Sequence, residues 1–271
     1  MIPLGLTPAL PDAQYHRREL GLVSKSALDL VHRSPAHYKA WIDGSLEEEE
    51  TPALHFGKAF HCAVLEPDRF ASTYAAEPDF GDCRKKENKA ARDDWRAAHA
   101  GRELISFGEH EMLLGMAASV RRHPLASKMI REGQPELTVS WRDEETGLQC
   151  KSRADYFVEK LAMVADVKSC LDASPDGFRR SVVKYRYHVQ DALYRAGFAA
   201  VDAPVQHFVF IAVEKPRPHA VAVYTLEADG IGRGYSSARE DIDTLADCVK
   251  RNVFPGYPPG INELTLPPWA D

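Results

Sequence analysis

The chain has 271 residues, of which 44% are hydrophobic and 27% charged, and its formal net charge is −6. This composition is ordinary for a globular protein, and no apolar run approaches the ~20 residues of a membrane span. The N-terminus lacks the charged and then apolar layout of a secretory signal, so we expect a cytoplasmic protein that does not enter a membrane. The acidic balance does not indicate nucleic-acid binding, although a locally basic site can exist on an acidic protein.

The cysteines are scattered along the chain, and no two of them form a C-x-x-C pair. In a chain without a secretory signal, this spacing predicts reduced thiols and not a disulfide framework. It also argues against a zinc ribbon or an iron–sulfur cluster. The cysteines are Cys62, Cys83, Cys150, Cys170 and Cys248.

The first half of the chain has helical signals. Ser24 or Ser26 is a candidate cap for the first of these helices, and Pro35 begins the second. Apolar residues recur with helical spacing in four stretches, at about 24–31, 35–41, 52–65 and 109–122. The acidic run 47–50 and the polar stretch 78–89 are predicted to be loops.

From residue 136 onwards the period changes to the alternation of strands. Strands are predicted at about 136–142, 148–158, 161–168, 206–213 and 220–226. One long helix is expected between the third and fourth strands, at about 175–200, and another at 230–251. This order predicts an α/β fold in which helices flank a mixed β-sheet.

The domain expected from these elements is single and spans residues 1–271. Residues 1–130 would form a mainly helical elaboration, and residues 136–252 the α/β core. A proline-rich tail, 253–271, contains Trp269, whose role as a core cover or a partner contact the sequence leaves open.

Three chemically suggestive residues fall on two neighbouring predicted strands. Asp155 lies near the end of one strand, and Asp166 and Lys168 lie in the next. A two-residue turn near Glu159-Lys160 would make the strands antiparallel, so that residues at equal distances from the turn face each other. Residues 155 and 166 are near that condition, and their carboxylates can approach one metal ion. Alternate residues of a strand share a face, so Asp166 and Lys168 point the same way. The pattern therefore places two carboxylates and an ammonium around one point.

This arrangement suits phosphodiester hydrolysis. Two carboxylates in close contact repel, and a divalent cation such as Mg²⁺ removes the conflict. The bound cation acidifies a water molecule, and a lysine can orient or deprotonate it. An isolated Asp-x-Lys is more often a surface ion pair, but the preceding Asp and the following helix favour the catalytic interpretation.

The order of several short motifs resembles that of the PD-(D/E)xK nucleases, in particular the phage and prophage 5′→3′ exonucleases of the exonuclease VIII (RecE) type and, more distantly, lambda exonuclease and the RecB nuclease domain. The resemblance covers about residues 22–198. It is carried by HFGKAFHCAVLEP, PELTVSWRDE, SRADYF, VADVKS and HVQDALY. It implies a restriction-endonuclease-like core with a helical N-terminal elaboration.

The resemblance also implies a metal site. His61, Asp155 and Asp166 would be ligands, together with the backbone carbonyl of Val167, and Lys168 would serve the attacking water. Two Mg²⁺ ions are expected, and Mn²⁺ would substitute. On its own, His61 would be interpreted as a core histidine.

Other residues receive more peripheral roles from the same resemblance. Gln190 and Tyr194, four apart on a helix, would position the scissile strand, although Tyr194 also suits plain helix packing. Glu136 is a candidate carboxylate beside the metal or behind its ligands, or an exposed strand start. The segment RRELGLVSKSALDL resembles the part that binds the DNA 5′ end in these exonucleases. Its candidate phosphate contacts are Arg17, Arg18, Ser24 and Ser26. The same residues also fit a capped helix with exposed arginines.

The expected function is Mg²⁺-dependent, processive 5′→3′ digestion of double-stranded DNA, leaving 3′ single-stranded overhangs for phage-type homologous recombination. The implied partners are double-stranded DNA ends, a single-strand annealing protein and further copies of the chain in a ring, a trimer being favoured over a tetramer. Two alternatives stay open: a Cas4-like or RecB-like nuclease of other polarity, and a non-catalytic DNA-binding subunit on a nuclease fold.

Overall fold

A computed structural model describes residues 2–46 and 51–265 of the chain. Its centre is a six-stranded sheet with the strand order β1-β4-β5-β6-β7-β8. These strands are β1 (Gly5–Thr7), β4 (Gln134–Arg142), β5 (Gln149–Val158), β6 (Met163–Cys170), β7 (His207–Glu214) and β8 (Val221–Tyr224). A separate two-stranded sheet pairs β2 (Tyr74–Glu77) with β3 (Glu103–Ser106).

The main sheet is mixed. Strand β5 is antiparallel to both of its neighbours, β4 and β6. Strands β6 and β7 are parallel, and β8 returns antiparallel to β7. A parallel pair needs a crossover, which here is helical. The predicted mixed α/β fold is therefore confirmed.

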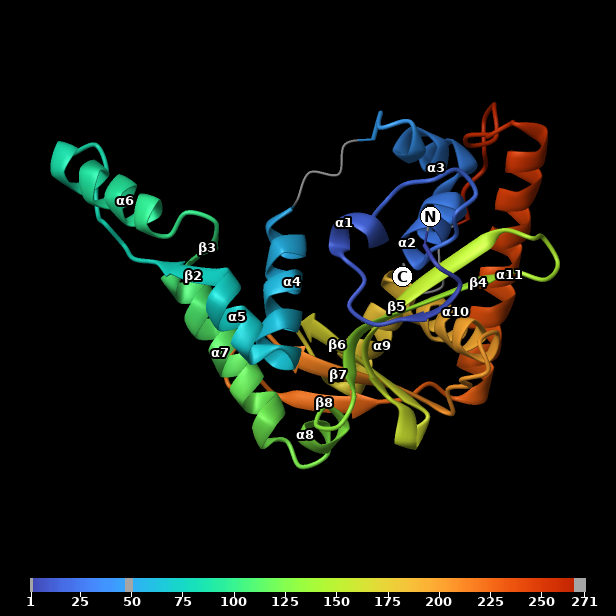
Figure 1. The fold of residues 1–271 in the computed structure, drawn as a ribbon. Coiled ribbons are helices and arrows are strands. Elements are labelled where there is room, and N and C mark those ends of the chain that lie inside the picture. The colour runs from blue at the N-terminus through green and yellow to red at the C-terminus, as the bar shows by residue number, and fades with distance from the viewer. Residues whose placement is uncertain (1, 47–50, 266–271) are drawn as a thin grey trace.

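The helices cover both faces of the sheet (Figure 1). Their bounds are α1 (Asp12–Tyr15), α2 (Lys25–Arg33), α3 (Pro35–Ile42), α4 (Pro52–Leu65), α5 (Pro67–Thr73), α6 (Lys86–Ala98), α7 (Phe107–Arg122), α8 (Ala126–Met129), α9 (Pro175–Lys184), α10 (Tyr187–Ala199) and α11 (Ala228–Arg251). One hydrophobic cluster packs α2, α3, α10 and α11 on the sheet, and a second packs α4, α5 and α7 on it. Strand β7 contributes residues to both clusters, and this explains its almost wholly apolar sequence.

The prediction of one long helix at 175–200 is wrong, because this segment forms two helices. Helix α9 ends at Lys184 and α10 begins at Tyr187. Between them Arg186 has φ +53°, in the left-handed region, which breaks the α-helical hydrogen-bond ladder. Its guanidinium lies 2.5 Å from Asp241 of α11 and 3.1 Å from Asp29 of α2, so tertiary ion pairs hold the break.

Two loop predictions also need correction. Residues 78–89 are not entirely a loop, since α6 begins at Lys86. This helix projects from the body on the β2–β3 pair, as Figure 1 shows. The turn between β5 and β6 is longer than two residues, because Glu159–Leu161 form a 3₁₀ turn and Ala162 is left-handed. Leu161 is thus in the turn and not in the strand.

Some predictions fall outside the described residues, namely the acidic run 47–50 and Trp269. Within the described ranges, no helix has the length and apolar character needed to cross a membrane.

Candidate active site

Three carboxylates occupy adjacent positions across three strands. The β4–β5 register pairs Pro135 with Tyr156 and Leu137 with Ala154, so Glu136 lies opposite Asp155. The β5–β6 register pairs Tyr156 with Ala165, and the next opposed position joins Asp155 to Asp166. The strands separate here, since Asp155 Oδ2 accepts a hydrogen bond from the Val167 backbone at 2.8 Å. The register thus ends one position before Asp155 and Asp166 and leaves these two residues on neighbouring strands.

Helix α4 adds a histidine from the neighbouring layer. The Thr51 hydroxyl accepts a hydrogen bond from Leu54 N and so begins this helix. His61 Nδ1 lies 3.5 Å from Asp155 Oδ2. One ligand atom from each of His61, Glu136 and Asp155 lies within 4.8 Å of the other two. Glu136, expected either near the metal or at an exposed strand start, therefore faces the same point as His61.

The third carboxylate is held by side chains of its own strand and of α10. Lys168 Nζ forms an ion pair with Asp166 Oδ2 at 2.6 Å, and Gln190 Nε2 donates to Asp166 Oδ1 at 2.6 Å. Asp166 is fully buried. The predicted residues Asp166, Lys168 and Gln190 are thus brought together, whereas Asp166 lies outside the tight set formed by His61, Glu136 and Asp155.

The electrostatics of the site favour a cation. Burial and the adjacent Asp155 raise the pKa of Glu136 to about 7. Burial likewise raises the pKa of Asp166 to about 6, against the attraction of Lys168. For Lys168, burial alone would lower the pKa, but the Asp166 and Asp155 carboxylates outweigh it and raise the pKa. The lysine is therefore an ammonium, and the carboxylates are crowded with negative charge.

The donor set fits a divalent cation. An imidazole nitrogen and two carboxylates converge on one point, and oxygen-rich sets with one imidazole suit hard or borderline divalent ions. A cation would also relieve the repulsion that raises the pKa of Glu136. His61, Glu136 and Asp155 are consequently the residues that could hold it, with Asp166 as a further carboxylate beside them.

Tyr194 lies in the core beside this cluster. It is 8% exposed and packs edge-on against Phe208, with ring centroids 5.8 Å apart. Burial raises the pKa of its hydroxyl well above the usual value, and Tyr15, Asp166 and Asp155 add to the rise. Tyr194 therefore packs in the core as a helix-packing residue, and its role in positioning the scissile strand stays a prediction.

The N-terminal candidates for phosphate contacts are spread out. Arg17 pairs with Glu19 at 3.4 Å, and Arg18 donates to the Trp41 carbonyl at 3.1 Å. Ser24 accepts a hydrogen bond from Ala27 N and caps α2, whereas Ser26 lies within that helix and is exposed. The capped helix is thus observed, and the predicted contacts with a phosphate stay a prediction.

The sequence reasoning missed a set of residues that ties the N-terminal segment to the sheet. Arg153 Nη1 lies 2.5 Å from Asp12 Oδ1 and 3.6 Å from Glu136 Oε2. Its guanidinium also stacks 3.9 Å from the Tyr15 ring centroid. Lys151 donates to the Tyr15 carbonyl, and burial lowers its pKa to about 8. The signal was in the strand KSRAD, where Lys151, Arg153 and Asp155 alternate and so share a face.

The fold and the cluster together define a class. A mixed sheet with Asp155 on one strand and Asp-x-Lys on the next is the arrangement of PD-(D/E)xK proteins. A family model described as a PDDEXK-like domain of unknown function (DUF3799) matches residues 24–265. The chain belongs to this family, and the predicted membership of the PD-(D/E)xK class is confirmed. The comparison with curated proteins gave no match.

A solved structure shows a similar fold. A candidate exonuclease from Eubacterium rectale matches with a TM-score of 0.64 and 13% identity, over 91% of this chain and 88% of that chain. At this identity the similarity concerns the fold alone. The structure of SSO0001 matches with a TM-score of 0.32 and 11% identity, over 75% of this chain and 88% of that chain, which is too low to support a conclusion.

Proposed function

We propose that this protein is a Mg²⁺-dependent exodeoxyribonuclease of the exonuclease VIII (RecE) type, which digests double-stranded DNA from 5′ ends and leaves 3′ overhangs. The observation that carries the proposal is the row of Glu136, Asp155 and Asp166 across three strands. His61 lies beside Asp155, and Lys168 is paired with Asp166. The similar fold of the candidate exonuclease from Eubacterium rectale is consistent with the same chemistry.

Each residue of the cluster has a role in this proposal. His61, Glu136 and Asp155 would hold Mg²⁺, or Mn²⁺ in its place, and the bound ion would lower the pKa of a water and stabilise charge on the phosphate. The Val167 carbonyl and Asp166 would complete a site for two ions. A Lys168 ammonium would orient the attacking water and donate to the developing oxyanion.

Gln190 and Tyr194 would act as positioning residues. Gln190 fixes Asp166 through its 2.6 Å hydrogen bond, which leaves the other carboxylate oxygen for Lys168. Tyr194 would support the cluster from the core side. Arg17, Arg18, Ser24 and Ser26 would bind the phosphate at the 5′ end.

Assembly and partners belong to the same proposal. A ring of identical chains, three more readily than four, would enclose the duplex and make digestion processive. A single-strand annealing protein would take over the 3′ overhang during phage-type recombination, in the cytoplasm.

The proposal is tested with linear duplexes labelled at the 5′ ends or at the 3′ ends. Wild-type protein with Mg²⁺ should release the 5′ label first, and EDTA should abolish release. Lys168→Ala should reduce the rate at least 100-fold, since a positioned proton-transfer group contributes about 10²–10⁴-fold. Lys160→Ala is the matched control, because Lys160 is an exposed lysine in the turn of the same hairpin.

The two alternatives give different results in this assay. Early release of the 3′ label, or cutting of closed circles, would identify a Cas4-like or RecB-like nuclease of other polarity. Binding of duplex ends with no label release at any Mg²⁺ or Mn²⁺ concentration would identify a non-catalytic DNA-binding subunit. Equal rates for Lys168→Ala and wild type would remove Lys168 from the mechanism.

A further inference from the structure

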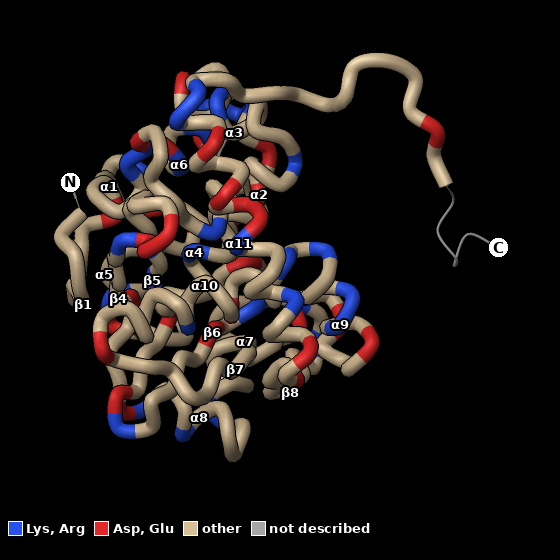
Figure 2. Tube along the Cα trace, turned by 90° about the vertical axis from the view of Figure 1, so that its right-hand side faces the viewer, with Lys and Arg blue, Asp and Glu red and all other residues tan. Residues whose placement is uncertain are grey.

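The N-terminal segment, residues 2–18, is held against strand β5 by side chains of that strand. Lys151 donates to the Tyr15 carbonyl, and Arg153 Nη2 donates to the Leu10 carbonyl at 2.9 Å. These two basic residues share one face of β5, because alternate residues of a strand point the same way. Figure 2 shows the segment, with α1, on the side of the molecule that carries β1, β4 and β5. The segment is therefore attached to the strand that also supplies a carboxylate of the active site.

Arg153 is buried, and several partners hold its guanidinium. The side chain is 8% exposed. Nη1 lies 2.5 Å from Asp12 Oδ1, and Nε donates to the Thr138 hydroxyl at 3.2 Å. The ring of Tyr15 covers the guanidinium, with its centroid 3.9 Å from Arg153 Cζ. A planar fork with this many partners is fixed in position.

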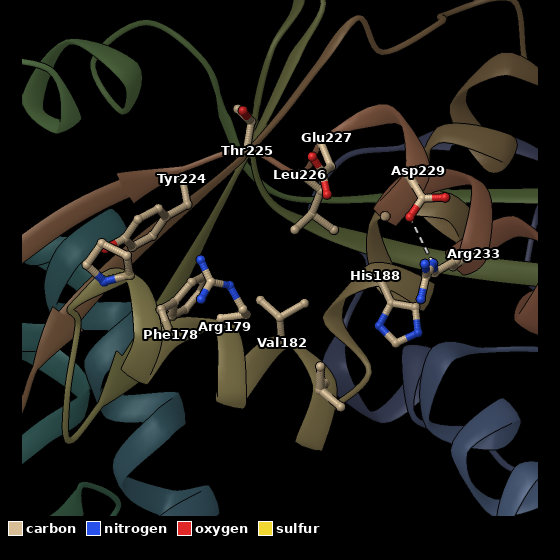
Figure 3. A pocket seen from close by; sticks show the side chains of 13 residues that line it. Phe178, Arg179, Val182, His188, Tyr224, Thr225, Leu226, Glu227, Asp229 and Arg233 are labelled. Carbon is tan, nitrogen blue, oxygen red and sulfur yellow. Dashed lines mark hydrogen bonds and ion pairs between the residues drawn. The ribbon is translucent and has the colours of Figure 1, made fainter. Parts of the chain in front are cut away.

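An exposed arginine of the same chain provides a contrast. In the groove bounded by α9, the end of β8 and the start of α11 (Figure 3), Arg233 forms an ion pair with Asp229 at 2.9 Å. Both side chains are exposed, so water screens the pair and it contributes little. Around the buried Arg153 this screening is weak. A substitution of Arg153 should therefore affect the groups that it contacts, whereas a substitution of Arg233 should not affect the active site.

One contact of the Arg153 guanidinium is with the active site. Nη1 lies 3.6 Å from Oε2 of Glu136, which belongs to the neighbouring strand β4. Glu136 has φ +52°, so its side chain does not follow the regular alternation of that strand. The groups around it therefore set its direction, and Arg153 is a cationic group that is itself fixed. Since a carboxylate has two oxygens, contact of one of them with Arg153 leaves the other for a cation.

We propose that Arg153 is a positioning residue, which holds the Glu136 carboxylate towards the metal site and connects it, through Asp12, to the N-terminal segment. This inference rests on the proposed function in one respect, namely that Glu136 is a ligand of the cation. Partners that hold a metal ligand fix its orientation, and their loss typically reduces metal affinity about 10–100-fold. The charge of Arg153 alone would have the opposite effect, because a positive charge repels Mg²⁺ or Mn²⁺. The sign of the change in affinity thus separates positioning from simple charge.

Calorimetric titration of the whole, metal-free chain with Mn²⁺ tests the proposal. Arg153→Met keeps a long side chain in the same space but cannot hold the carboxylate, and it should lower the Mn²⁺ affinity about 10–100-fold. Arg233→Met is the matched control, because it also removes an arginine from an ion pair with an aspartate, and it should change the affinity less than about twofold. Unchanged or tighter binding of Mn²⁺ by Arg153→Met would overturn the proposal.

Two further variants decide the question if circular dichroism shows that Arg153→Met does not fold. Asp12→Asn changes a side chain that is 64% exposed, so the fold should tolerate it. It releases the guanidinium from the N-terminal segment and should weaken Mn²⁺ binding about threefold, since the other partners of Arg153 remain. Arg153→Lys keeps the charge but should also weaken binding, because an ammonium lacks the fork that contacts both Asp12 and Glu136. Wild-type affinity in Asp12→Asn would overturn the connection with the segment, and wild-type affinity in Arg153→Lys would overturn the positioning role.

A double-mutant cycle with Glu136→Gln shows whether Arg153 acts through Glu136. In the Glu136→Gln background, Arg153→Met should change the Mn²⁺ affinity less than about twofold, because the carboxylate that it holds is already absent. A purely structural role would instead give an equal loss of affinity in both backgrounds, and this result would overturn the proposal.

Failure of the proposed nuclease function gives a different result. Wild-type protein that binds no Mn²⁺ would refute the metal site itself, and the role of Arg153 with it. Wild-type protein that binds Mn²⁺ but degrades no DNA would refute the nuclease function alone, and the affinities of the Arg153 variants would still decide the positioning role.

Discussion

At the scale of single residues, the cluster depends on an unusual backbone conformation. Glu136 has φ +52°, in the left-handed region that costs a residue with a side chain of order 1–3 kcal/mol. The flanking residues Pro135 and Leu137 keep their register with β5. The strain therefore turns one side chain out of the strand alternation, towards Asp155 and His61. Strain of this kind is expected where a side chain has a function.

Glu136→Gln should weaken metal binding and stabilise the metal-free fold. Loss of a carboxylate ligand should lower the affinity for Mn²⁺ at least tenfold in calorimetry. Without metal at pH 8, the variant should unfold at a higher urea concentration than wild type, because the raised pKa of Glu136 shows that its charged form is disfavoured in the fold. Glu132→Gln, an exposed residue, is the control. A variant that retains wild-type affinity for Mn²⁺ would contradict the ligand role.

Asp191 should make stability depend on pH. Its side chain is fully buried, and burial raises its pKa to about 6 against the ion pair with Arg195. A raised pKa in the folded state means that the stabilising contribution is complete below pH about 3.8 and is lost as the pH rises through about 6. Urea unfolding at pH 4, 5.5 and 7 should therefore show wild type losing stability relative to Asp191→Asn. If the difference in free energy of unfolding between wild type and Asp191→Asn is the same at all three pH values, Asp191 does not cause the pH dependence.

At the scale of elements, close approaches between helices position the active-site helix. Helix α10 carries Gln190 and Tyr194, and it is held on its outer side by α11. A Cβ added at Gly234 of α11 would lie 2.1 Å from the carbonyl oxygen of His188. Only glycine fits at this contact, so the spacing of the two helices depends on it.

Gly234→Ala should therefore destabilise the protein. The clash with a backbone atom should lower the free energy of unfolding by about 2–3 kcal/mol, as overpacking does. Gly232→Ala on the same helix has nothing within 4 Å and should instead gain up to about 1 kcal/mol from helix propensity. Urea denaturation of both variants measures the difference. Equal shifts of the urea midpoint by the two substitutions would contradict the close contact between Gly234 and His188.

At the scale of the whole molecule, the sheet joins two hydrophobic cores. Phe60 of α4 belongs to one cluster and Phe198 of α10 to the other, and both are fully buried. The active site draws His61 from the first of these layers and Gln190 from the second. The cluster therefore exists only when both helical layers are packed on the sheet.

Phe60→Ala and Phe198→Ala should each lower the midpoint of one common unfolding transition. Removal of a buried phenylalanine side chain costs about 3–5 kcal/mol, and a shared sheet should transmit the loss to both layers. Circular dichroism and tryptophan fluorescence should give coincident midpoints in each variant. Two separate transitions would show that the layers unfold independently.

The sequence by itself determined the fold class and the central strands. Alternation and apolar runs predicted β4 to β8 and the helix that begins near Ala228, because these patterns are local consequences of which faces are buried. It also predicted that Asp155, Asp166 and Lys168 would be close, because an antiparallel hairpin brings the residues on the two sides of its turn back together. Small elements such as β1 and the projecting α6 were missed, since short or solvated segments carry little hydrophobic pattern.

Only the tertiary structure decided which side chains complete the site. His61 approaches from another layer, and Glu136 turns inward through a left-handed backbone. Arg186 breaks a continuous helical pattern because its guanidinium pairs with carboxylates on α2 and α11. Spacing along one segment contains no information about such contacts. They depend on how separate elements pack, and this is why the Asp-x-Lys strand was predictable from the sequence and its surroundings were not.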